Sequence, residues 1–302
     1  IIDNGLVTVG GNLAATTDAA HGVINLGTLA VDGTVALATH GSGNATVVND
    51  NGLTFAAATV GGNLAATATA GHMTDNGALA ITGTTTLTTS ANNATIALDT
   101  TTNAFTGAVT ITTNDDSGTD ADVTIDGGTT ALTLAASTID GDLTVRNGNS
   151  ITDSGIVTVG GNLAATTDAN SGLINMGTLA VDGTVQLTTN GSGNATVVND
   201  AGLNFAASTV GGNLAATATT GNMTDSGALT IAGTSSFTTS ANNADITLRH
   251  EPLNNANALT GAVTLSTTGS TGHATIDNGI TALDIAASSV GGNLTVRSGH
   301  AS

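Results

Sequence analysis

The chain has 302 residues and a formal net charge of −19, with only three basic side chains, all of them arginine. Because phosphate binding requires a Lys or Arg footprint, this charge argues against nucleic acid and anionic membranes as partners. No stretch approaches eighteen consecutive apolar residues, so we expect no membrane insertion by this segment. The absence of cysteine excludes disulfides and leaves the compartment open.

One short pattern, apolar-x-Gly-x-apolar-x-apolar, recurs twelve times along the sequence. The first residues of successive copies are separated by 20 to 34 residues. Six of these spacings run from 20 to 24 residues, and the other five are 29, 34, 29, 28 and 31 residues long. A repeat of this length cannot bury its own apolar face but can bury it against a neighbour, which is typical of a solenoid. The pattern begins at Val9, Val31, Val60, Ile81, Phe105, Ile139, Val159, Val181, Val210, Ile231, Leu259 and Val290.

A second, longer period lies over the first. The first six spacings add up to 150 residues, and the segment Ile1–Val9 returns in similar form as Ile151–Val159. We therefore expect one repeat block of six rungs over residues 1–150 and a second, continuous block of six rungs over residues 151–302.

Apolar residues alternate with polar or small ones on both sides of each glycine. In Leu29–Leu37, for example, Val31 and Val35 share one face of an extended chain while Asp32 and Thr34 take the other. Glycine between two such strands suits a tight corner where the next rung lies close. The predicted corner glycines are Gly11, Gly33, Gly62, Gly83, Gly107, Gly141, Gly161, Gly183, Gly212, Gly233, Gly261 and Gly292.

Short strands joined by corners in units of about 20 to 30 residues predict an all-β fold, a parallel β-helix or β-solenoid. The twelve copies of the pattern predict about twelve rungs. Parallel crossover connections favour a right-handed coil.

Three groups of repeats carry a family resemblance. They are Val-Gly-Gly-Asn-Leu, first at Val9–Leu13, the Thr-Asp-Asn-Gly-Ala-Leu run at Thr74–Leu79, and Ala-Phe-Thr-Gly-Ala-Val at Ala104–Val109. The sequence resembles the repeat region of filamentous-haemagglutinin-type exoproteins, which are exported by two-partner secretion. That resemblance implies a right-handed β-helix in a large bacterial surface or secreted fibre used in adhesion or biofilm cohesion. No secretion domain of that family is recognisable, and no functional residue carries over.

The sequence therefore predicts a structural segment of a secreted or cell-surface bacterial fibre, an adhesin shaft or extracellular matrix filament. We expect it to be part of a longer polypeptide or to stack head to tail with other subunits, because exposed terminal strands invite pairing. Its partners would then be further copies of itself and a surface receptor that the sequence does not identify. The alternative is a β-helical module that binds or degrades polysaccharide.

We expect no catalytic residues and no cofactor. A polysaccharide-degrading site would need clustered carboxylates and bases on one face. Asp32 and Asp182 occupy equivalent coils of the two blocks and Asp140 and Asp142 share one coil, but no stacked pair of acids results. The absence of Trp and Tyr also disfavours a sugar-gripping surface.

Two interruptions of the pattern remain as candidate sites. The acidic run with Asp115, Asp116, Asp120 and Asp122 could supply oxygen ligands to Ca²⁺, although a solvated turn explains it more simply. The insert with Arg249, His250 and Glu251 holds the only Glu and could carry binding specificity, with a tolerated surface insertion as the simpler interpretation. The histidines in turns are interpreted as surface residues.

Overall fold

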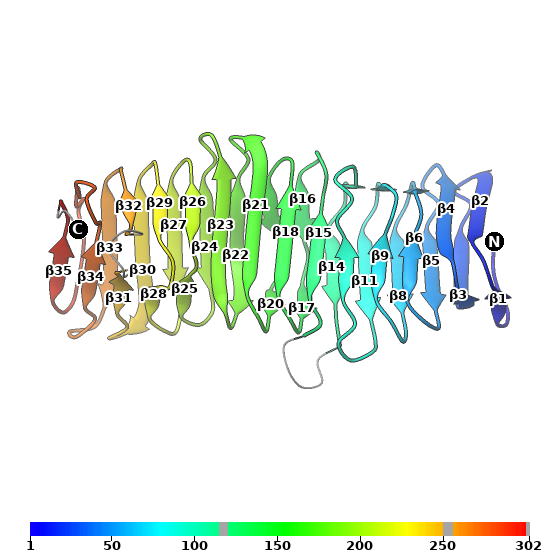
Figure 1. Ribbon diagram of the computed structural model, residues 1–302, viewed down its shortest axis with the longest axis horizontal. Coiled ribbons are helices and arrows are strands. Elements are labelled where there is room, and N and C mark those ends of the chain that lie inside the picture. Colours follow the sequence, from blue (N-terminus) through cyan, green and yellow to red (C-terminus); the bar gives the residue numbers. More distant parts are fainter. Residues whose placement is uncertain (115–119, 250–255, 300–302) are drawn as a thin grey trace. The chain divides into compact units, whose positions relative to one another are not determined.

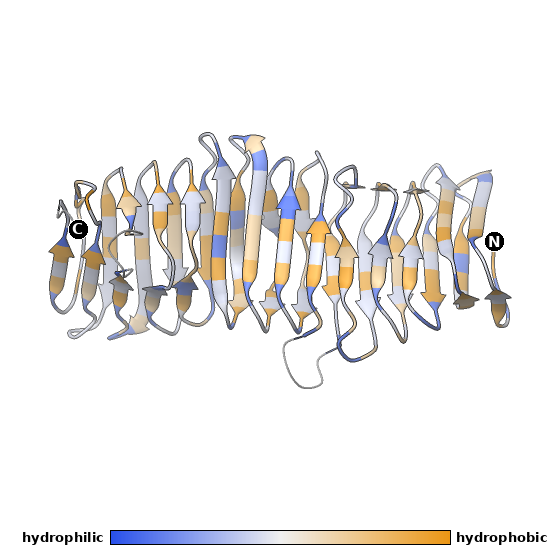
Figure 2. Cartoon of the chain, in the orientation of Figure 1, coloured by the Kyte–Doolittle hydropathy of each residue, from blue (hydrophilic) through white to orange (hydrophobic). Residues whose placement is uncertain are grey.

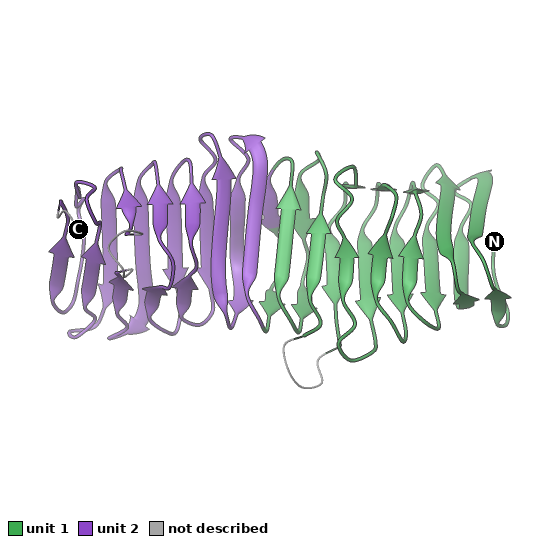
Figure 3. Ribbon diagram, in the orientation of Figure 1, with its two compact units in different colours: residues 1–149, 153–160 green, residues 150–152, 161–302 purple. Residues whose placement is uncertain are grey.

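A computed structural model describes residues 1–114, 120–249 and 256–299. The described residues form strands and turns only, with no helix, and therefore none that could cross a membrane. The chain divides into two compact units, shown in green and purple in Figure 3. Unit 1 comprises Ile1–Asn149 and Asp153–Gly160, and unit 2 comprises Ser150–Thr152 and Gly161–Ser302.

Unit 1 is built from two parallel sheets, and the chain alternates between them as it coils (Figure 1). The strands of its first sheet are β1 (Val7–Val9), β3 (Ile24–Val31), β5 (Ala45–Asn49), β8 (Leu64–Ala68), β11 (Thr85–Thr89), β14 (Val109–Thr112), β16 (Leu132–Leu134), β17 (Ser137–Ile139) and β20 (Val157–Val159). Those of its second sheet are β2 (Leu13–Ala20), β4 (Thr34–His40), β6 (Leu53–Phe55), β7 (Ala58–Val60), β9 (Met73–Asp75), β10 (Leu79–Ile81), β12 (Ile96–Leu98), β13 (Ala104–Phe105), β15 (Val123–Asp126) and β18 (Leu143–Asn147).

Unit 2 repeats this arrangement. The strands of its first sheet are β19 (Ile151–Asp153, of which the first two residues belong to this unit), β22 (Ile174–Val181), β24 (Ala195–Asn199), β27 (Leu214–Ala218), β30 (Ser235–Asn242) and β33 (Val263–Thr268). Those of its second sheet are β21 (Leu163–Asn170), β23 (Thr184–Asn190), β25 (Leu203–Phe205), β26 (Ser208–Val210), β28 (Met223–Asp225), β29 (Leu229–Ile231), β31 (Ile246–Leu248), β32 (Ala258–Leu259), β34 (Ala274–Asp277) and β35 (Leu294–Arg297).

Each strand pairs in parallel with the equivalent strand one turn later. In the first sheet of unit 1, Thr46 pairs with Ala65, which pairs with Thr86, which pairs with Thr110. The prediction of an all-β parallel solenoid is therefore confirmed, with about 13 turns in place of the twelve expected.

The core is the column of inward side chains between the two sheets. In β8 the residues alternate between buried and half-buried, and a similar alternation recurs in strands such as β5 and β24. Figure 2 shows hydrophobic residues along the strands of both units. All four phenylalanines are fully buried, and in unit 2 the rings of Phe205 and Phe237 meet edge to face at 6.4 Å. The two-residue period of the sequence thus marks the buried face, as expected for strands.

The seven-residue pattern does not mark the same corner in every turn, and this explains why twelve copies accompany about 13 turns. At Val9 the pattern leads from the first sheet to the second, whereas at Val60 it leads from the second back to the first. The long spacings from Val31 to Val60 and from Phe105 to Ile139 each span about one and a half turns, because the pattern has moved to the opposite corner. One copy per rung therefore does not hold along the whole chain, since no copy begins in β14 or β15.

Corner glycines are required by close stacking between turns. None of the twelve predicted positions has a positive φ. At Gly62 an added Cβ would overlap Asn44 Oδ1, and at Gly83 it would overlap Asn63 Oδ1. Gly11, in the first turn, has open space around it. These glycines therefore serve the approach of neighbouring turns and not a left-handed backbone.

Candidate functional site: a polar groove in each unit

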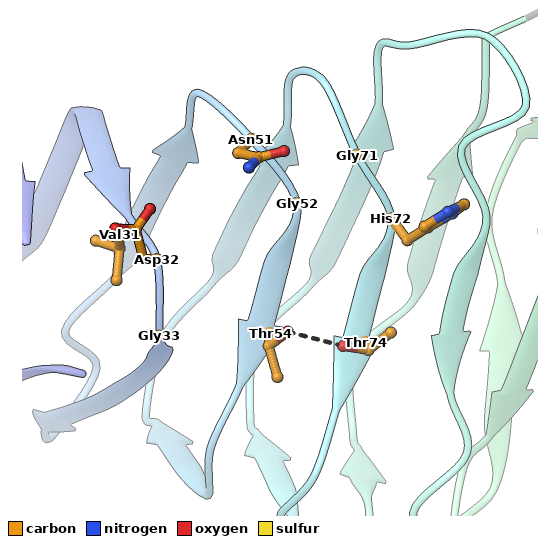
Figure 4. A pocket seen from close by; sticks show the side chains of 9 residues that line it. All are labelled: Val31, Asp32, Gly33, Asn51, Gly52, Thr54, Gly71, His72 and Thr74. Atoms are coloured by element: carbon orange, nitrogen blue, oxygen red, sulfur yellow. Dashed lines mark hydrogen bonds between the residues drawn. The ribbon is translucent and has the colours of Figure 1, made fainter. Parts of the chain in front are cut away.

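Unit 1 has a polar groove of about 380 Å³ on its surface (Figure 4). Residues from three successive turns line it, and most carry short polar side chains or none. The lining residues are Val31, Asp32, Gly33, Asn51, Gly52, Thr54, Gly71, His72 and Thr74.

The groove exists because two neighbouring turns part at this corner. Leu29 is in register with Asn49, and Thr34 is in register with Thr54. Between these points the backbone of one turn does not pair with that of the next. Instead, Val31 N–H donates to Asn49 Oδ1 (2.9 Å), and Asn49 Nδ2 donates to Val31 O (3.0 Å). The asparagine side chain thus makes the two hydrogen bonds that a neighbouring strand would make. The space between the two turns on the outer side of this side chain is the groove.

The groove in unit 1 offers uncommitted hydrogen-bonding groups. Asp32 and Asn51 are exposed, and within the described part of the chain no residue donates a hydrogen bond to the Asp32 carboxylate. Thr54 Oγ1 and Thr74 Oγ1 lie 3.0 Å apart across adjacent strands. Figure 4 shows Asp32 and Asn51 on the two sides of the opening. The site contains acceptors and donors but no Lys or Arg.

Unit 2 has a groove at the equivalent position, with a volume of about 250 Å³. Asn199 supports it as Asn49 does in unit 1, accepting from Val181 N–H (2.8 Å) and donating to Val181 O (3.0 Å). The exposed carboxylate returns as Asp182. The lining residues are Val181, Asp182, Gly183, Ala201, Gly202, Leu203, Asn204, Asn222 and Thr224.

The two grooves differ at three positions. Asn51, Thr54 and His72 of unit 1 correspond to Ala201, Asn204 and Asn222 of unit 2. The chain therefore carries two natural variants of one site, built on the same backbone.

A ladder of side-chain acceptors lines the corners. In each case a side chain at the corner accepts the backbone N–H of the next turn, as Asn44 accepts from Asn63 (2.8 Å). His72 does the same through Nδ1, which accepts from Thr95 N–H (3.0 Å), whereas Asn222 takes that role in unit 2. This role of the histidine was missed when turn histidines were interpreted as surface residues only. Members of the ladder are Asn12, Asn44, Asn63, His72, Asp122, Asn162, Asn194, Asn213, Asn222 and His273.

Buried asparagines were also missed. Besides Asn49 and Asn199, Asn103 accepts from Leu79 N–H (2.8 Å) and Asn257 accepts from Leu229 N–H (2.7 Å). Their signal in the sequence is an asparagine at an inward position of the alternation, as in Val47-Val48-Asn49.

The candidate calcium ligands are only partly described. Asp115 and Asp116 lie outside the described residues. Asp122 Oδ1 accepts from Asp142 N–H (2.8 Å), and Asp120 N–H donates to Asp140 Oδ2 (3.3 Å). Among the residues that the structure describes, no group of three or more acidic or histidine side chains could hold a metal ion.

The other predicted sites are likewise resolved in part. His250 and Glu251 lie outside the described residues, while Arg249 is exposed and its N–H donates to Asp225 Oδ1 (2.8 Å). Asp140 is buried, with 6% of its surface exposed, and its N–H donates to Thr113 Oγ1 (2.9 Å). Its carboxylate therefore takes part in the packing of one turn on the next and is poorly placed to meet a polysaccharide.

Comparison with curated proteins and with solved structures finds no significant match. A family model described as repeats of unknown function matches residues 42–112, 120–176 and 192–266. These segments cover more than half of the sequence, and the chain belongs to this family of repeats of unknown function, DUF5649.

Proposed function

We propose that this chain is a structural segment of a secreted or cell-surface bacterial fibre, serving as an adhesin shaft or extracellular matrix filament. The observation that carries the proposal is the parallel pairing of turn on turn within each unit, with one apolar column inside. Such stacking can be extended by adding turns, because each turn contacts mainly its neighbours.

The hydrogen bonding of the corners supports a mechanical role. Side-chain acceptors such as Asn63, which receives Thr84 N–H (2.9 Å), join successive turns where the strands end. Backbone bonds such as Gly83 N–H to Gly62 O (2.9 Å) do the same. A chain tied at strands and corners has few sites for local opening.

Further turns of the same kind are the partners we propose, supplied by more repeats or by another copy. In the first turn of unit 1, Ile1, Ile2 and Leu6 are exposed, and in the last strand of unit 2, Leu294 and Val296 are exposed. Stacking another turn against them would bury these side chains and satisfy the strand edges. A receptor on a host, neighbouring cell or matrix surface remains part of the proposal.

The second candidate function is a polysaccharide-binding module, which the duplicated polar groove favours. We do not extend it to polysaccharide degradation, since a hydrolytic or lyase site needs a convergent acid and base. The absence of enzymatic activity stays a prediction.

The test uses the purified chain of residues 1–302. Size-exclusion chromatography with light scattering, followed by electron microscopy, should show concentration-dependent end-to-end association. Replacing Leu294 and Val296 by Asp should abolish it, while Thr46→Asp, on an outward face, should leave it unchanged. A monomer at every concentration would refute self-stacking, and antibodies that fail to label intact source cells would refute a surface location.

A further inference from the structure

We propose that the groove of each unit binds a neutral polyhydroxylated ligand, a segment of a glycan chain. The proposal concerns Asp32, Asn51, Thr54 and Thr74 in unit 1 and their counterparts in unit 2. It does not depend on the chain being part of a fibre.

The first argument is the chemistry of the lining. A sugar hydroxyl both donates and accepts a hydrogen bond, so a row of hydroxyls needs a mixture of acceptors and donors. Asp32 supplies an uncommitted carboxylate, which accepts from two hydroxyls, and the Asn51 carboxamide supplies both kinds of group. The Thr54 and Thr74 hydroxyls bond to each other at 3.0 Å and retain lone pairs for a ligand.

The second argument is charge. No Lys or Arg lines either groove, and the chain as a whole carries a formal charge of −19, which disfavours phosphates, sulfates and acidic sugars. A divalent cation such as Ca²⁺ needs six to eight oxygen ligands, usually with several carboxylates. Each groove has one, Asp32 or Asp182. A neutral polar ligand is the class that remains.

The third argument is form. Two glycines, Gly52 and Gly71, line the groove beside short side chains, and each allows the backbone of the neighbouring turn to lie close. The volume of about 380 Å³ in unit 1 falls within the range of small-molecule sites, and the volume of about 250 Å³ in unit 2 lies just below it. The groove is open to solvent, which suits a section of a longer chain.

The fourth argument is recurrence. Both units part their turns at the same corner, by the same buried asparagine, and both place an aspartate at the opening. Asn204, which lines the groove of unit 2, has an enclosed Oδ1 without a hydrogen-bond partner. No Phe, Tyr or Trp ring is available for stacking, since the chain has no Tyr or Trp and all four phenylalanines are buried. We therefore expect weak binding, with a Kd on the order of 1 mM per groove.

The experiment is an NMR titration of the ¹⁵N-labelled full chain with cellohexaose, chitohexaose and maltohexaose in turn. At least one should cause saturable shifts of the Gly52, Gly71 and Thr54 amides in unit 1 and of Gly202 in unit 2. Asp32→Ala should weaken binding at the unit 1 groove about tenfold and leave unit 2 unchanged, and Asp182→Ala should do the reverse. Asn51→Ala, which copies Ala201, should bring the affinity of groove 1 toward that of groove 2.

Asp18→Ala, at an exposed carboxylate on β2 outside both grooves, is the matched control and should bind normally. A parallel titration with CaCl₂ tests the cation alternative. The proposal is overturned if none of the three sugars shifts these amides at about ten times the expected Kd. It is equally overturned if CaCl₂ alone shifts them, or if the Asp32→Ala, Asp182→Ala double variant binds with undiminished affinity.

Discussion

The side chain of Asn49 pairs with the backbone of Val31 as a neighbouring strand would. Val31 N–H donates to Asn49 Oδ1 (2.9 Å), and Asn49 Nδ2 donates to Val31 O (3.0 Å) and to Gly52 O (2.7 Å). One buried amide therefore forms hydrogen bonds with three backbone groups at the place where two turns separate. The polar groove lies on the outer side of this amide.

Asn49→Ala should destabilise unit 1 by about 3 kcal/mol, because three backbone groups would lose their partner and the amide is 1% exposed. The shift in the midpoint of urea unfolding, followed by circular dichroism, measures this effect. Thr46→Ala, on the outward side of the same strand, should change stability by about 0.5 kcal/mol or less. Equal effects of the two substitutions would show that the asparagine does not close the corner.

The alternation of apolar residues was enough to predict the strands and their buried face. Val31 and Val35, for example, are predicted to face inward and are at most 3% exposed. The number of turns was predicted closely, with about 13 found where about twelve were expected, but the corners could not be assigned in the same way. The seven-residue pattern has the same residue types where the chain enters the second sheet, as at Val9, and where it leaves that sheet, as at Val60. Only pairing between turns distinguishes the two corners.

The groove could not be predicted from residue spacing. Asp32, Asn51 and Thr74 lie in three successive turns and meet only because the turns stack at this register. The interruptions of the pattern, which the sequence singled out, fall largely in segments outside the described residues. The structural role of the buried Asn49 could have been predicted from the sequence, because a polar residue at an inward position needs a hydrogen-bond partner.

Thr85→Val should stabilise unit 1 by about 1 kcal/mol. Thr85 is fully buried and its Oγ1 has no hydrogen-bond partner, so the hydroxyl has lost water without compensation. Val109, its register partner one turn later, shows that the column accommodates valine. Ser235→Ala should have the same sign in unit 2, where Ser235 Oγ is likewise unpartnered.

Thr89→Val, four residues further along the same strand, is the matched control. Thr89 is as buried as Thr85, but its Oγ1 donates to Ala94 O (3.0 Å). Its replacement should therefore destabilise by about 1 kcal/mol. Thermal unfolding of the two variants side by side decides the matter, and destabilisation by both would contradict the role assigned to the unpaired hydroxyl.

His72→Asn should be nearly neutral and His72→Ala should loosen the corner. Asparagine already occupies this place in unit 2, where Asn222 Oδ1 accepts from Asp245 N–H (2.8 Å). Alanine leaves Thr95 N–H without its acceptor, at a cost of about 0.5 to 1 kcal/mol at an exposed site. Hydrogen exchange of the Thr95 amide measures the difference, with the Asp245 amide as internal reference. Faster exchange in both variants would show that the ring acts by packing instead.

Acid should release the first turn of unit 1 through Asp3. The backbone N–H of Thr28 donates to Asp3 Oδ2 (2.7 Å), and this bond, with those from Gly27 N–H and Thr28 Oγ1, holds the pKa of Asp3 below its ordinary value despite the opposing effect of desolvation. Because the folded state favours the carboxylate, its contribution is present above the ordinary aspartate pKa of about 4 and is lost as the pH falls through the lowered pKa. Carbon-13 NMR of the Asp3 carboxyl should titrate at lower pH in the folded chain than in the urea-unfolded chain, and the Thr28 amide proton should shift with the same midpoint. Asp3→Asn should remove the acid response of Thr28, and a Thr28 amide that still follows pH in that variant would assign the response to another group.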